Sequence, residues 1–195
     1  MNRGLAETIR GQIDASIAVK QAMLRDEEIL GQIDALANLC LQSLQAGGKI
    51  IFAGNGGSFA DAQHLSAEFT SRFLFDRAPL PSLALGTNSS AMSAIGNDYG
   101  YDRVFARELA GIAKTGDVFV PITTSGNSTN ILAAVAAAKD MNLATVALTG
   151  HGGGKLKGRC ECICIPSTET ARIQECHIMV GHILCGLVES EYFRQ

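Results

Sequence analysis

The sequence predicts an α/β fold, a three-layer sandwich in which a central parallel sheet is flanked by helices on both faces. Apolar runs of strand length alternate with helix-length segments through most of the chain, and strands joined in this way lie parallel beneath two helical layers. The 195 residues are 47% hydrophobic and include 21 glycines, which suits a closely packed core. Because the composition does not shift along the chain, we expect one domain over residues 1–195.

The first 46 residues are expected to form two helices outside the α/β core, which then spans residues 47–195. In the first helix a large aliphatic residue recurs every four positions, at Leu5, Ile9, Ile13 and Ile17. In the second, apolar residues continue at mixed helical spacings, at Ile29, Ile33, Leu36, Leu39 and Leu44. Gly47 and Gly48 end that helix. We expect the two apolar faces to pack between subunits as well as within one, which predicts a homo-oligomer.

Five strands, with helices between them and after the last, are expected to follow. The expected strands cover residues 49–53, 82–85, 117–122, 144–148 and 161–165. The expected helices cover residues 58–75, a short segment after Thr87, 101–113, 127–141 and 170–192. Ligands of such sheets bind beyond the carboxyl ends of the strands, and three loops fall there, at 54–58, 87–90 and 123–128.

Charge and hydropathy exclude several classes of partner. The formal net charge is −3, which favours neither nucleic acid nor an anionic membrane surface. No apolar run approaches the roughly 20 residues that span a bilayer, and no secretion signal is recognisable. We therefore expect a cytoplasmic protein without a membrane or nucleic-acid partner.

The chain contains six cysteines, and three of them alternate at strand spacing, at Cys160, Cys162 and Cys164. This pattern differs from the C-x-x-C spacing of a structural zinc site. A disulfide framework is not expected in a chain of this size without a secretion signal. Buried free thiols are the expected state, with a metal or redox role as the alternative.

A glycine loop provides the first candidate site. The apolar run at 50–53 is followed by Gly54-Asn55-Gly56-Gly57-Ser58, which opens directly into a helix. Free backbone N–H groups and the positive end of a helix dipole suit a phosphate or another anion there. His64 and Glu68, four residues apart, project from one face of that helix about one turn further in. The combination predicts chemistry on a small phosphorylated molecule.

A second loop of this kind again lies between an apolar strand and a helix, and it reads Thr123-Thr124-Ser125-Gly126-Asn127-Ser128. Its hydroxyl groups can hold a phosphate without a lysine. The alternative is an ordinary helix N-cap with serine, threonine and asparagine turn chemistry. Two such loops after parallel strands in one domain favour phosphate binding.

The last expected helix carries polar residues whose roles the spacing leaves open. Gln174 and His182 lie about 80° apart around the helix axis and two turns apart along it, so they can converge on one object. His177 competes for that role. A lone histidine on a largely apolar helix is also more often a core residue than a ligand.

The segment 94–101 is also ambiguous. Asn97 and Asp98 lie among glycines and tyrosines that bend the chain. They either hold sugar hydroxyls or form a turn between two helices, and the sequence leaves the choice open.

Taken together, these residues resemble those of the sugar isomerase (SIS) domain family, and within it the phosphoheptose isomerases. The resemblance covers essentially the whole chain, including the leading helix pair. The matching motifs are Ala53-Gly54-Asn55-Gly56-Gly57-Ser58, Asp61-Ala62-Gln63-His64, Ala67-Glu68-Phe69, Gly96-Asn97-Asp98-Tyr99, Thr124-Ser125-Gly126-Asn127-Ser128 and Arg172-Ile173-Gln174-Glu175-Cys176-His177, the last leading to His182. The resemblance implies a flavodoxin-like sandwich and a homotetramer with sites assembled at subunit boundaries.

The resemblance also implies one zinc ion per subunit and a sugar-phosphate site. The implied zinc ligands are His64, Glu68, Gln174 and His182, which offer donor types that zinc accepts, although an amide oxygen is uncommon. The implied sugar contacts are Asn55, Gly56, Gly57, Glu68, Asn97, Asp98 and Gln174. The implied phosphate contacts are Ser58, Thr123, Thr124, Ser125 and Ser128.

The reaction implied is the conversion of sedoheptulose 7-phosphate to D-glycero-D-manno-heptose 7-phosphate, which feeds the heptose of surface glycans. Moving a carbonyl from C2 to C1 needs a base that carries a proton between the two carbons through an enediol, and an acid that serves the oxygens. Glu68 is the candidate base and His182 the candidate acid. Zinc would polarise the carbonyl.

Three positions depart from the family pattern. Thr123 stands where the family usually has serine and keeps the hydroxyl group. Asn88 replaces an aspartate often seen in that loop, and Ala171 occupies a position that is aspartate in some members. Both substitutions remove a carboxylate near the site and bear on substrate preference.

The competing interpretation is a non-catalytic SIS domain, either a scaffold that binds the replication initiator or a sugar-phosphate sensor. Such a protein has no need for Glu68 and His182, and both are present, so the enzyme is favoured. An isomerase for another sugar phosphate is a further alternative. A dinucleotide site is poorly supported, because Phe59 occupies the third glycine position of G-x-G-x-x-G and no acidic residue follows near Leu85.

Overall fold

Five parallel strands form the centre of the computed structural model, which describes residues 3–194. The strands are β1 (Ile50–Gly54), β2 (Ser82–Ala84), β3 (Val118–Thr123), β4 (Ala144–Thr149) and β5 (Glu161–Cys164). Their order across the sheet is β2-β1-β3-β4-β5, and every neighbouring pair is parallel. The expected fold class is confirmed, and each expected strand is present.

Alternation along β1 divides the core into two apolar clusters. Ile50 and Phe52 belong to one cluster, and Ile51 and Ala53 belong to the other, because successive side chains of a strand point to opposite faces. All five residues of β1 are buried. This is why the strand reads as a continuous apolar run rather than an alternating one.

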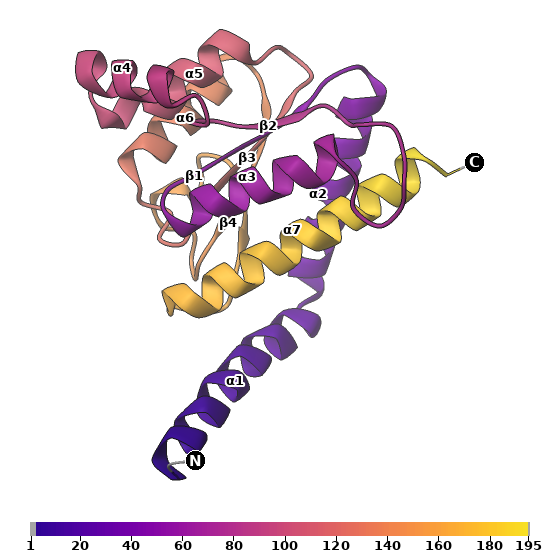
Figure 1. The fold of residues 1–195 in the computed structure, drawn as a ribbon, viewed down its shortest axis with the longest axis vertical. Coiled ribbons are helices and arrows are strands. Elements are labelled where there is room, and N and C mark those ends of the chain that lie inside the picture. Colours follow the sequence, from indigo (N-terminus) through magenta and orange to yellow (C-terminus); the bar gives the residue numbers. More distant parts are fainter. Residues whose placement is uncertain (1–2, 195) are drawn as a thin grey trace.

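Helices cover both faces of the sheet (Figure 1). One face packs against α2 (Glu27–Gln45), α3 (Gly57–Thr70) and α7 (Thr170–Tyr192). The other packs against α5 (Val104–Ile112) and α6 (Thr129–Asp140), with α4 (Ser89–Tyr99) alongside α5. α3 and α7 lie side by side, so residues distant in the sequence share one surface.

The N-terminal helix α1 (Arg3–Leu24) extends away from this body (Figure 1). It is anchored near its C-terminal end by buried Met23, and the Arg172 Nη1 donates to the Gln12 carbonyl oxygen at 2.8 Å. Its aliphatic stripe is 46–61% exposed and consists of Leu5, Ile9, Ile13 and Ile17. Within one chain this stripe is therefore uncovered.

The structure corrects the end of one expected helix. α3 ends at Thr70 instead of residue 75. The guanidinium of Arg77 donates to the Glu68 and Phe69 carbonyl oxygens at 2.8 and 2.7 Å, which satisfies two acceptors that a helix C-terminus leaves unpaired. The Arg77 guanidinium that caps this helix lies outside it, so the periodicity of apolar residues could not show where the helix ends.

Smaller differences concern the segment after β2. The expected helix at 101–113 divides into a 3₁₀ turn, Tyr101–Arg103, and α5. Residues 97 and 98 lie in the last turn of α4 rather than in a loop. A second 3₁₀ turn, Gly154–Leu156, precedes β5.

Among residues 3–194, no helix combines the length and apolar character needed to cross a bilayer. The cytoplasmic location stays a prediction.

Candidate active site

The glycine loop after β1 adopts a conformation that requires glycine at two positions. Gly56 has φ +57°, and it precedes the first residue of α3. A Cβ on Gly54 would overlap the backbone of Ser58, so the loop folds back tightly on the helix start. The side-chain amide of Asn55 exchanges two hydrogen bonds with the amide of buried Asn130, at 2.8 and 2.9 Å. The N-terminus of α3 is thus presented by a rigid turn.

The second loop places hydroxyl groups at the start of α6. The Thr123 and Ser128 hydroxyl oxygens lie 3.2 Å apart, and the Ser125 Oγ accepts from the Asn127 amide at 3.1 Å. Ser128 occupies the N-cap position, but its side chain makes no capping hydrogen bond. The loop therefore contains the serine and asparagine turn contacts of that alternative, at Ser125 and Asn127, but no side-chain cap at Ser128.

Three side chains of metal-binding type meet between α3 and α7. The Nε2 atoms of His64 and His182 lie 2.9 Å apart, and the His64 Nε2 lies 3.2 Å from the Glu68 Oε1. Potential ligand atoms of all three residues fall within 4.8 Å of one another. His64 is 49% exposed and Glu68 24% exposed at the side chain, so the cluster is open to a small molecule.

Close helix packing produces this encounter. Gly181 faces Leu65, and a Cβ on Gly181 would overlap the leucine side chain. The absence of a side chain there lets α7 approach α3, and the next residue, His182, then reaches His64 across the helix pair.

Two further side chains adjoin the cluster. The Phe73 ring stacks on His182, with ring centroids 5.5 Å apart and an interplanar angle of 28°. Burial raises the pKa of the half-buried Asp61 carboxyl, and the neighbouring His64 and His182 act against that rise. Neither residue has a role in the prediction from sequence. The spacing of Asp61, three residues before His64 on one helix face, is a signal that could have indicated it.

Gln174 lies at the glycine loop rather than in the three-residue cluster. A Cβ on Gly57 would lie 2.6 Å from the Gln174 Nε2, so the amide rests on the start of α3. Gln174 and His182 are eight residues apart on α7, about 12 Å along the axis. The site is therefore elongated, with an amide at one end and the imidazoles at the other.

Asn97 and Asp98 lie elsewhere in the chain. Both are exposed at the end of α4, where the Asn97 Nδ2 donates to the Asp98 Oδ1 at 2.8 Å. They line a separate pocket with Ser89, Ser90 and Ser93. α4 flanks the face of the sheet opposite to α7, so one chain does not bring these two residues to the His64 cluster.

His177, the competing histidine of α7, is a core residue. It is fully buried, and its Nε2 lies 3.1 Å from the Thr149 carbonyl oxygen. Burial lowers the pKa of His177 from 6.5 to about 4, against a smaller opposing effect of that hydrogen bond. It does not face the site.

His177 is expected to make the free energy of unfolding fall in acid. Between about pH 6.5 and pH 4 the unfolded chain binds a proton that the native chain does not, so stability decreases as the pH falls through this window. The expected loss is about 2 kcal/mol at pH 5 relative to pH 8. Urea unfolding at pH 8, 6 and 5 measures it. The His177→Gln variant keeps a donor for Thr149 and should lose less stability over the same range; an equal loss would contradict the assignment.

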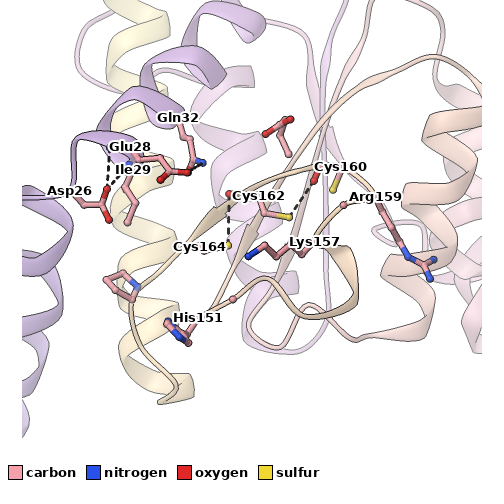
Figure 2. A pocket seen from close by; sticks show the side chains of 14 residues that line it. Asp26, Glu28, Ile29, Gln32, His151, Lys157, Arg159, Cys160, Cys162 and Cys164 are labelled. Atoms are coloured by element: carbon pink, nitrogen blue, oxygen red, sulfur yellow. Dashed lines mark hydrogen bonds between the residues drawn. The ribbon is translucent and has the colours of Figure 1, made fainter.

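The cysteines are free thiols: Cys40, Cys176 and Cys185 are buried, whereas Cys160, Cys162 and Cys164 are half-buried. The latter three line a pocket of about 690 Å³ between β5 and the start of α2 (Figure 2). The Cys162 and Cys164 thiols donate to the Cys160 and Cys162 carbonyl oxygens at 3.5 and 3.8 Å. Over residues 3–194, His64, Glu68 and His182 form the one group of histidine, cysteine or acidic side chains spaced to hold a metal ion.

The protein has a parallel sheet with helices on both faces, a glycine loop and a cluster of two imidazoles and a carboxylate. These features define an α/β protein that binds a small ligand, and comparison with known proteins identifies the family. The model of the SIS domain matches residues 14–150. A phosphoheptose isomerase of Aneurinibacillus thermoaerophilus is 52% identical over 187 residues, which cover 95% of this chain and 94% of that protein.

Solved structures agree. A phosphoheptose isomerase from Francisella tularensis superposes with a TM-score of 0.90 at 33% identity, over 95% of this chain and 98% of that one. The enzyme from Neisseria gonorrhoeae gives a TM-score of 0.86 at 42% identity, over 95% and 99% of the two chains. The chain belongs to the SIS domain family and, within it, to the phosphoheptose isomerases, which makes it an enzyme of the aldose–ketose isomerase class.

Proposed function

We propose that this protein converts sedoheptulose 7-phosphate to D-glycero-D-manno-heptose 7-phosphate, for the heptose of surface glycans. The observation that carries the proposal is the meeting of His64, Glu68 and His182 within 4.8 Å between α3 and α7, on the same helix whose N-terminus suits an anion. Relatives named phosphoheptose isomerase, at 44–54% identity, support the choice of substrate.

The donor set fits a zinc ion. Two imidazole nitrogens and a carboxylate oxygen are ligands of catalytic zinc sites, which keep one position open for water or substrate. His64, Glu68 and His182 would hold the ion. Gln174, the fourth ligand that the family resemblance implies, lies at the glycine loop of the same chain, apart from these three side chains. Zinc so bound would polarise the sugar carbonyl.

Glu68 and His182 are proposed to move the protons. Glu68 removes a proton from the carbon beside the carbonyl and returns it to the neighbouring carbon, through an enediol. His182 serves the two oxygen atoms, giving a proton to one and taking it from the other, through the ring nitrogen that would not hold the ion. The two side chains lie on facing helices, so both can contact one substrate carbon pair.

The loops are proposed to bind the substrate's ends. Ser58 at the start of α3 and the hydroxyl loop at the start of α6 suit the phosphate, because both lie at helix N-termini. The proposed phosphate contacts are Ser58, Thr123, Thr124, Ser125 and Ser128. The proposed sugar contacts are Asn55, Gly56, Gly57, Glu68, Asn97, Asp98 and Gln174.

We also propose a homotetramer with sites at the subunit boundaries. The exposed aliphatic stripe of α1 supports it, because an uncovered stripe of this length favours packing against another chain. Asn97 and Asp98 support it as well, since within one chain α4 packs on the face of the sheet opposite to the helices that carry the His64 cluster. Analytical ultracentrifugation should give the mass of four chains, and a single-chain mass would contradict the assembly.

Metal removal is the decisive test of the reaction. Turnover of sedoheptulose 7-phosphate, followed by NMR of the two sugar phosphates, is expected to disappear after chelation and to return when zinc is restored. Magnesium added in its place should not restore it, because magnesium prefers oxygen ligands and octahedral geometry. Absence of turnover with zinc supplied and the oligomer intact would shift the assignment to a scaffold, a sensor or another sugar phosphate.

A further inference from the structure

The segment between α3 and β2, residues 71–81, is irregular, yet a buried ion pair fixes it. The Arg77 Nε donates to the Glu189 Oε1 at 2.8 Å, and the two side chains are 3% and 0% exposed. Glu189 lies near the C-terminal end of α7, so the pair ties this loop to the helix that carries His182.

Both partners of the pair use their remaining hydrogen-bonding capacity on backbone groups. The Glu189 carboxylate accepts from the Phe73 and Leu74 amides at 2.9 and 2.6 Å. Arg77 donates to the Glu68 carbonyl oxygen, which places one end of the network on the backbone of the candidate base. Such a satisfied buried network holds a single arrangement of the chain.

The network determines where Phe73 lies. With its amide bound to Glu189, Phe73 directs its ring onto His182, with centroids 5.5 Å apart. A Cβ added to Gly186, one turn further along α7, would lie 3.5 Å from the same ring. His182 is therefore flanked by the Phe73 ring and by His64, whose ring centroid lies 5.1 Å away.

We propose that Phe73, held by Arg77 and Glu189, is a positioning residue that sets the ring orientation of His182 for metal binding and proton transfer. This inference rests on the proposed function. Hydrogen-bonding groups that orient a metal-binding imidazole typically change metal affinity or activity by about 10–100-fold when they are removed, and a ring stacked on the imidazole is expected to act in the same direction.

Phe73→Leu tests the proposal with little risk to folding, because leucine keeps an apolar contact and removes the stacked ring. We expect about 10-fold weaker zinc binding, measured by competition with a chromophoric chelator, and a lower kcat at nearly unchanged KM. The visible spectrum of the cobalt(II)-substituted protein should change as well. Phe73→Tyr keeps the ring and should behave as the wild type.

Phe75→Leu is the matched control, since Phe75 lies in the same loop but its ring contacts Phe193 instead of His182. Zinc affinity and cobalt spectrum in Phe73→Leu equal to those of Phe75→Leu would overturn the inference and leave the isomerase assignment intact. A wild type that neither binds zinc nor turns over the sugar phosphate would overturn the proposed function instead. The NOEs between the His182 and His64 ring protons of the metal-free protein then decide the inference. Altered NOEs in Phe73→Leu support it, and unchanged NOEs overturn it.

Discussion

Replacing Glu68 with glutamine is expected to abolish isomerisation while leaving the sugar phosphate able to bind. Glutamine preserves the size of the side chain and an oxygen donor, but it has no basic carboxylate to accept the proton from carbon. Loss of the base is expected to lower kcat by about 10²–10⁴-fold. Single-turnover kinetics and titration with sedoheptulose 7-phosphate separate the two effects.

The same substitution at Glu161 provides the control. Glu161 is exposed on β5 and lines the pocket of Figure 2, away from the His64 cluster. Glu161→Gln should retain wild-type kcat and KM. A Glu68→Gln enzyme with a near-normal rate would remove Glu68 from the role of base. Loss of substrate binding along with turnover would show that Glu68 is needed for binding, as an ion-holding residue or a sugar contact.

The sheet and the glycine loop were accessible from the sequence because their signals are local. The apolar run of β1 ends at Gly54. Gly56 has a positive φ, and a glycine in a loop is the residue that such a conformation favours. The four-residue spacing of His64 and Glu68 likewise places both side chains on one helix face before any tertiary contact is known.

His182 was harder, because its partner lies 118 residues away in the sequence. Spacing on α7 could not distinguish His182 from His177, and only the packing of α7 on α3 separates the exposed ligand face from the core face. The family resemblance pointed to His182, whereas helical spacing alone left open whether His177 or His182 is the ligand. The position of Asn97 and Asp98 on the far side of the sheet was equally beyond reach, since sequence motifs carry no information on which face of a sheet a helix covers.

The C-terminal end of α3 is a case in which the sequence pattern predicted too long a helix. Apolar residues continue at helical spacing through Phe73, so the pattern predicts a longer helix. The chain leaves the helix because Arg77 and Glu189 together satisfy two carbonyls at the end of the helix, those of Glu68 and Phe69, and two amides beyond it, those of Phe73 and Leu74. An ion pair between residues so far apart in the sequence cannot be predicted from local composition or periodicity.

Replacing Glu189 with alanine is expected to be the most destabilising of the substitutions considered. Arg77 would keep a buried charge without its partner, which costs about 3–5 kcal/mol. This is a large part of a typical folding free energy of about 5–15 kcal/mol. Urea unfolding followed by circular dichroism, at a fixed protomer concentration, measures the difference.

Glu191→Ala is the matched control on the same helix. Its ion pair with Arg194 is exposed, at 47% and 75% of the two side chains, so its removal should change the free energy of unfolding by less than about 0.5 kcal/mol. Equal unfolding midpoints for the two variants would show that the Arg77–Glu189 pair does not fix the loop.

A paired apolar replacement, Arg77→Met with Glu189→Leu, separates charge from hydrogen bonding. Removing both charges should recover much of the loss, because no unpaired ion is left in the core. Recovery should be incomplete, since the Phe73 and Leu74 amides lose their acceptor, and each unsatisfied buried donor costs about 1–3 kcal/mol. Full recovery would mean that the two amides find other partners, and then the carboxylate would not be what places Phe73 against His182.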